Sequence, residues 1–151
     1  MKKFLVLILV SLFIMGVVST GWCQDAEIKQ TVKNFYNGIE TGNVKKMLAN
    51  VTPKVVKQIA DSKGNLKKFG DLGGALLVAG FVNKGFAKVD ITKLKVKINN
   101  KGAEKAKVTT NFDLKMTATG DGKVTGEKAS DIIKLKKVNG RWLIYDIISQ
   151  K

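Results

Sequence analysis

Alternation of polar and apolar residues in the C-terminal half most constrains the fold of this 151-residue chain. Between residues 105 and 118 every second side chain is apolar, with Thr110 the one exception, and the residues between them are polar or charged. The segment 93–98 has the same period. A period of two places successive side chains on opposite faces of a strand. The pattern therefore predicts strands that bury one face and expose the other.

Turn sequences divide this half into four strands. Residues 99–102 precede the long strand, and Asp121-Gly122 and Asn139-Gly140 are typical of tight hairpin turns. We therefore predict a four-stranded antiparallel meander, with the last strand beginning at Arg141. Both faces of that strand are expected to be covered, because both are apolar: one by helices and one by a second chain, which would make a homodimer through the sheet. Trp142, Ile144, Asp146 and Ile148 are expected on one face, and Leu143, Tyr145 and Ile147 on the other.

The segment before the strands has helical periodicity. Apolar residues over 26–40 form one stripe, with Asp25 as the expected N-cap and Gly42 as the C-terminal stop. A short helix is expected next, and Thr52-Pro53 is typical of the start of a third helix. Residues 61–71 are predicted to be a loop. Residues 72–86 are predicted to be a glycine-rich core helix, with the lid of an apolar pocket or a shallow lipid-inserting surface as alternatives. Helices followed by strands indicate an α+β domain.

The first 23 residues have the layout of a secretory signal peptide. Two lysines precede an apolar stretch from residue 4 to 18, and small residues follow. A membrane-spanning helix needs about 20 residues, so the sequence favours a cleaved signal over an N-terminal anchor. Cleavage is expected after Cys23, or alternatively after Gly21; lipidation of Cys23 is less favoured because bulky Trp22 precedes it. We expect one domain over 24–151, exported to a periplasm or secreted.

Two residue types limit the chemistry. Histidine is absent and Cys23 is the only cysteine. The lack of histidine excludes Ser-His and Cys-His nucleophilic triads and histidine-based metal sites. A single cysteine excludes an intramolecular disulfide. No pair of acids has the spacing of a cation site or of glycosidase chemistry, so we expect no metal and no cofactor.

The chain is strongly basic, with 27 Lys and Arg against 12 Asp and Glu and a net charge of +15. Such a charge attracts anionic lipid, polysaccharide or nucleic acid. Nucleic acid is disfavoured, because Arg141 is the only arginine and no aromatic residues are interleaved with the lysines. The candidate surface for an anionic envelope component is the polar face of the first two strands: Lys93, Lys95, Lys97, Lys105, Lys107 and Lys115. The alternative is a solvated lysine surface without a partner.

Two segments resemble the nuclear-transport-factor-two-like superfamily, and especially its small exported bacterial members of unknown function. Residues 31–44 resemble that group's first helix, glycine-containing turn and second helix, and residues 137–144 resemble its closing hairpin. The resemblance implies a cone-shaped α+β fold in which helices and a curved sheet enclose a pocket. It does not imply a reaction. Neither the histidine-dependent dehydratases nor a ketosteroid-isomerase-like set can be mapped onto this chain.

The expected pocket has eight candidate ligand-binding residues and no assigned catalytic residue. They are Phe35, Tyr36, Met47, Phe81, Phe112, Met116, Trp142 and Asp146. Asp146 would be a general base if its face lined the pocket, and otherwise a solvated or lysine-paired carboxylate. Our main hypothesis is a non-catalytic domain that binds a small apolar or amphipathic molecule, or a protein partner. The alternatives are a module that binds anionic lipid or polysaccharide through the lysine face, and a small-molecule enzyme that uses Asp146.

Overall fold

The computed structural model describes the backbone of residues 2–150 and the side chains of residues 21–150. The side chains of the expected basic and apolar signal regions lie outside the described residues. The helices are α1 (Lys2–Glu40), α2 (Val44–Leu48), α3 (Pro53–Asp61), the 3-10 helix η1 (Leu66–Phe69) and α4 (Gly70–Asn83). The strands are β1 (Ala87–Lys101), β2 (Lys105–Ala118), β3 (Val124–Val138) and β4 (Arg141–Gln150).

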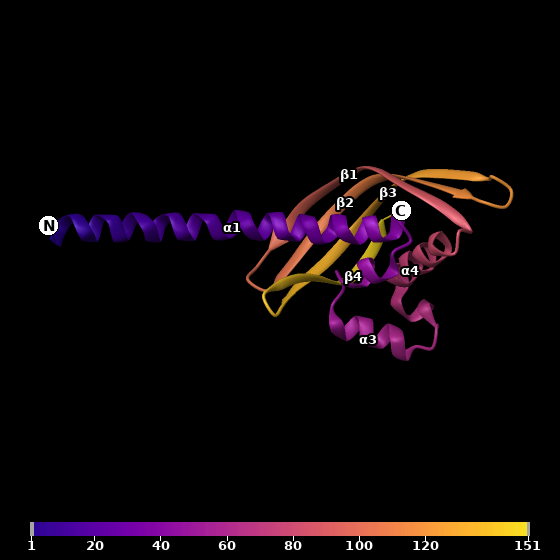
Figure 1. Cartoon of the computed structure of the whole chain (residues 1–151), viewed down its shortest axis with the longest axis horizontal. Helices are drawn as coiled ribbons and strands as arrows, with labels where there is room; N and C mark the ends of the chain where they lie inside the picture. Colours follow the sequence, from indigo (N-terminus) through magenta and orange to yellow (C-terminus); the bar gives the residue numbers. More distant parts are fainter. Residues whose placement is uncertain (1, 151) are drawn as a thin grey trace.

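The four strands form one antiparallel sheet in the order β1-β2-β3-β4, which confirms the predicted α+β class and meander. Asn139 and Gly140 both have positive φ, 50° and 80°, as the tight turn between β3 and β4 requires. Register shifts lie between Thr92 and Lys95 of β1 and opposite Lys134 and Leu135 of β3. Such bulges increase the local bend and twist of a strand. The sheet curves around α1, and the β2–β3 hairpin extends past the body at the end far from the N-terminus (Figure 1).

Helix α1 lies along the concave side of the sheet, and its N-terminal half extends beyond it (Figure 1). The predicted apolar stripe is buried throughout: Ile28, Val32, Phe35, Tyr36 and Ile39 are each at most 6% exposed. This stripe packs into a single core with residues from α4 and from the inward faces of β2, β3 and β4. The alternation of polar and apolar residues that predicts the strands therefore also identifies the strand residues that lie in the core.

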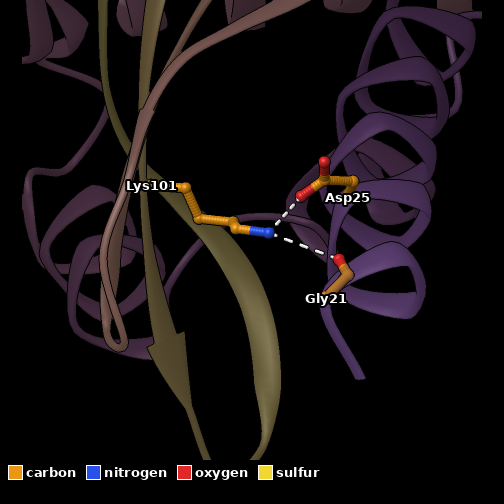
Figure 2. Close-up of polar contacts among 3 residues, drawn as sticks. All are labelled: Gly21, Asp25 and Lys101. Carbon is orange, nitrogen blue, oxygen red and sulfur yellow. Dashed lines mark hydrogen bonds and ion pairs between the residues drawn. The ribbon is translucent and has the colours of Figure 1, made fainter. Parts of the chain in front are cut away.

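The start of the first helix differs from the prediction. Helix α1 continues through residues 21–25, so Asp25 is not an N-cap. Its carboxylate instead forms an ion pair with Lys101 at the end of β1 (Figure 2). Glu27, also expected to be a helix-terminal charge, accepts a hydrogen bond from the backbone N–H of Trp142 at 3.1 Å. Both acids therefore fasten α1 to the sheet.

The connections between the helices agree with the sequence in part. Gly42 follows α1 with a φ of +65°, as expected of a stop, and Thr52 precedes Pro53 at the start of α3 without a side-chain capping bond. The predicted loop over 61–71 is shorter than expected, because η1 occupies 66–69 and α4 begins at Gly70. The backbone N–H of Thr52 donates to the carbonyl of Ile144 at 2.8 Å, which holds this connection against β4.

The prediction for the last strand is wrong beyond Ile144. Asp146 is opposite Lys134, whereas Ile144 is opposite the next residue, Leu135, so Tyr145 is an extra residue in a bulge. Consecutive residues of a strand face opposite sides, so Asp146 and Ile144 lie on opposite faces. Asp146 therefore does not share the face of Trp142, and Ile147 takes the inward position beside Ile133.

Candidate functional site

A cavity of about 610 Å³ lies between α1, α4 and the concave face of the sheet. Phe35, Tyr36 and Ile39 of α1 form one wall, and Ala75 and Val78 of α4 form another. All four strands contribute to the floor, which includes Ile91, Phe112, Leu114, Ala129 and Ile147. The walls are thus mainly apolar, and polar residues are placed at a few defined points. This composition is usual for small-molecule sites, whose volumes are roughly 300–1,000 Å³.

A buried hydrogen-bonded group lies at the base of this cavity. The Tyr36 hydroxyl donates to Asp131 Oδ2 at 2.5 Å and contacts Thr110 Oγ1 at 2.9 Å. A tyrosine hydroxyl has one proton, and here that proton is donated to Asp131, so Thr110 is the donor to Tyr36. Tyr36 is 3% exposed, Thr110 0% and Asp131 8%. The three side chains connect α1 to β2 and β3 beneath the ligand space.

Burial and the neighbouring Asp131 carboxylate raise the pKa of the Tyr36 phenol well above its ordinary range. The phenol therefore keeps its proton at neutral pH and remains a donor to Asp131. The ring of Tyr36 packs against Phe112, with 4.9 Å between ring centroids, and edge-on against Phe35 at 5.8 Å. These contacts fix the ring, so the hydroxyl is held in place by packing as well as by hydrogen bonds.

Sequence reasoning missed Asp131 and Thr110. Both were detectable from the alternation of inward and outward residues along a strand. Thr110 shares the inward face of β2 with Val108 and Phe112. Asp131 likewise shares the parity of Ile133 and Leu135, which are fully buried in β3. A polar residue at an inward position of an apolar strand indicates a buried polar site. The sequence did not show that Tyr36 faces both of them.

The structure distributes the eight predicted pocket residues over four environments. Phe35, Tyr36 and Phe112 line the cavity. Met47 and Trp142 are at most 1% exposed and belong to the core. Phe81 and Met116 line a separate groove of about 390 Å³ at the end of α4. Asp146 lies outside the cavity, where its carboxylate accepts from Lys134 Nζ at 2.8 Å.

The six lysines predicted to form an anion-binding surface are all exposed on β1 and β2. Lys93 lies in the β1 bulge with a φ of 55° and forms an ion pair with Asp113 at 2.8 Å. Across the sheet, Lys105 is directly opposite Lys136, and Lys107 is directly opposite Lys134. Like charges in direct cross-strand register destabilise a sheet. The outward face is therefore a basic surface that extends over three strands.

The second face of β4 gives limited support to a dimer interface. Leu143, on the face of β4 opposite to Trp142, is 6% exposed within the single chain. Ile148 is 41% exposed on that side. The homodimer stays a prediction. Over residues 21–150, whose side chains are described, no helix is both long and apolar enough to cross a membrane.

Helices packed on a curved four-stranded sheet around a cavity define a cone-shaped α+β fold. No protein-family model and no curated protein sequence matches the chain. Solved structures do match it and show that the fold is NTF2-like, as the sequence resemblance implied. One is an NTF2-like protein from Streptomyces avermitilis to which a dehydratase activity is ascribed, with 11% identity, a TM-score of 0.57, and coverage of 84% of this chain and 95% of that one. Another is the association domain of C. elegans CaMKII, with 11% identity, a TM-score of 0.54, and coverage of 85% and 96%.

Proposed function

We propose that this protein binds a small amphipathic molecule in the cavity between α1, α4 and the concave sheet face. The observation that carries the proposal is the cavity itself: about 610 Å³, with apolar walls and the Tyr36–Asp131 pair at its base. An amphipathic molecule would bury its apolar part against Phe35 and Phe112 and place a polar group at the base. Catalysis by Asp146 has no support, because that carboxylate is outside the cavity and paired with Lys134.

Native mass spectrometry of the purified chain at low and moderate salt tests the proposal directly. A small molecule that stays bound at moderate salt supports it, and its mass begins to identify the ligand. The same spectra distinguish monomer from dimer. If the purified protein is empty, the next measurement is whether it binds the apolar fluorophore Nile red.

A cavity-filling variant makes the fluorophore experiment specific. Ala75→Trp places an indole from α4 in the cavity, and Ala60→Trp adds the same group at an exposed position of α3. We expect Ala75→Trp to lose Nile red fluorescence and Ala60→Trp to keep it, with unchanged circular dichroism for both. Equal fluorescence in both variants would remove the cavity as the binding site.

We also propose that the protein is exported by its first 23 residues. The support is the sequence of that segment, with two lysines, an apolar stretch and small residues before Gln24. Expression in a bacterium with a periplasm, followed by fractionation and intact-mass measurement, tests it. A periplasmic product that begins at Gln24 or Trp22 is expected. A full-length product in the cytoplasm would contradict the proposal.

The basic sheet face is a second candidate site, for an anionic envelope polysaccharide. The specific observation is the direct register of Lys105 with Lys136, because an anionic polymer would relieve that repulsion. The salt concentration that elutes the protein from immobilised heparin is the measure. Lys105→Thr with Lys107→Thr should lower it more than the equal charge change Lys54→Thr with Lys57→Thr on α3. Equal decreases would indicate net charge alone.

A further inference from the structure

The cavity differs in charge from the rest of the protein. Its lining includes three carboxylates, from Asp71, Glu127 and Asp131, and one ammonium group, from Lys128. The whole chain has 27 basic residues and 12 acidic ones. The cavity is therefore acidic in a strongly basic protein. Asp71 lies in the first turn of α4 and accepts from the backbone N–H of Ser149 at 2.7 Å, which holds this carboxylate at the mouth.

Asp131 has an unused acceptor on the cavity side. Its Oδ2 accepts from Tyr36, while Oδ1 has no hydrogen-bond partner among the described residues. In the described part of the chain, two buried polar side-chain atoms have neither contact with solvent nor a hydrogen-bond partner. They are Thr52 Oγ1 and Trp142 Nε1. Oδ1 is not among them, so it stays accessible although Asp131 is only 8% exposed. Because Asp131 lines the cavity, this oxygen is offered to the ligand space.

We infer that the cavity selects an organic cation, a molecule with an apolar body and a primary ammonium group that binds Asp131 Oδ1. This inference rests on the proposed ligand-binding function and specifies its ligand class. An ammonium group has donors for a carboxylate oxygen, and such charge-assisted bonds are stronger than neutral ones. The apolar body would contact Phe35, Phe112 and Ile147. Among the described residues no cluster of three acidic or cysteine side chains could hold a metal ion. The apolar walls suit the body of an organic cation.

Competition among three eight-carbon compounds tests the inference in the full chain. Octylamine, octanol and octanoate share a similar tail and differ in the charge of the head group. Each compound is titrated at pH 7 into the protein with bound Nile red. The signal followed is the part of the Nile red fluorescence that the Ala75→Trp variant lacks. We expect octylamine to displace the probe at a concentration about tenfold or more below that of octanol, and octanoate to be the weakest.

Substitutions at the carboxylates assign the preference to named atoms. Asp131→Asn keeps the size of the side chain and removes its charge, and should bring octylamine within about twofold of octanol. Asp146→Asn, outside the cavity, should leave the preference unchanged. Glu127→Gln at the exposed mouth should reduce the preference by a smaller factor. If Asp131→Asn does not fold, two measurements decide the matter. One is the ratio of the octylamine and octanol concentrations that displace Nile red from the wild type, and the other is the change of that ratio in Glu127→Gln.

The outcomes separate this inference from the proposed function. Displacement of the probe with no preference for octylamine over octanol in the wild type would overturn the inference and leave the binding cavity intact. A preference that survives Asp131→Asn in a folded protein would also overturn it. If Nile red fluorescence is the same in the wild type and in Ala75→Trp, the proposed function itself fails.

Discussion

Lys101 at the end of β1 forms an ion pair with Asp25 of α1, and its Nζ also donates to the carbonyl oxygen of Gly21 at 3.3 Å (Figure 2). Lys101 is opposite Ala106, which is buried, so it occupies an inward position of the sheet. An inward lysine needs a partner, and α1 supplies two acceptors one helical turn apart. This contact fastens the helix to the sheet beside the expected cleavage positions.

Replacing this lysine should weaken the attachment of α1. Lys101→Met keeps the apolar stem and removes the ammonium group, and we expect the free energy of unfolding to fall by about 1 kcal/mol, because both partners are partly exposed. Urea denaturation measures the change. Lys97→Met on the outward face of the same strand is the matched control, with almost no expected effect. Equal losses in the two variants would show that the ion pair contributes nothing specific.

Close packing of α1 on α2 depends on Gly38. A Cβ at this position would lie 2.7 Å from the backbone nitrogen of Met47, closer than packing allows. We expect Gly38→Ala to lower the free energy of unfolding by roughly 1–3 kcal/mol, because backbone must move to accept the methyl group. Gly80→Ala in α4 meets nothing within 4 Å and should be neutral or stabilising by up to about 1 kcal/mol. Thermal denaturation compares them, and a neutral Gly38→Ala would contradict the packing.

The buried Tyr36 phenol should make stability depend on alkaline pH. Its pKa is raised in the folded chain, chiefly by burial and then by Asp131, whereas in the unfolded chain it ionises near about 10. Its contribution is therefore complete below about pH 10 and decreases above it, by up to about 1.4 kcal/mol per pH unit, because only the unfolded chain loses the proton.

Tyr36→Phe isolates this contribution. Urea denaturation between pH 9 and 11 should show a steeper loss for the wild type than for the variant, because other titrating groups are common to both. At pH 7 the variant should be less stable by about 1–3 kcal/mol, since it removes the donor to buried Asp131. Parallel pH dependence in the two proteins would show that Tyr36 does not stay protonated.

The register of the lysine face predicts opposite effects for one substitution at two positions of β2. Lys105 is opposite Lys136, whereas Lys115 is opposite Asp90. At low salt, Lys105→Thr should raise the free energy of unfolding by roughly 0.2–1 kcal/mol, and Lys115→Thr should lower it by a similar amount. Both differences should shrink at high salt, because screening weakens exposed charges. The same sign at both positions would mean that register does not control these energies.

Sequence periodicity alone determined most of the architecture. The stripe from Ile28 to Ile39, the alternation through Phe112 and the turn at Asn139-Gly140 depend on local geometry, in which side-chain direction follows from position in a helix or strand. These features therefore identified the α+β class, the antiparallel meander and the core residues of α1. Outward lysines on β1 and β2 followed from the same rule.

Tertiary structure alone decided the site. One extra residue, Tyr145, reversed the parity of β4 and moved Asp146 away from the cavity, because a bulge shifts every later side chain to the other face. Asp131, 95 residues beyond Tyr36, became the polar base of the cavity because the curved sheet brought β3 beneath α1. Lys101 and Asp25, 76 residues apart, met for the same reason. Period and turn type are local properties, whereas a cavity depends on how far a sheet bends and which helix covers it.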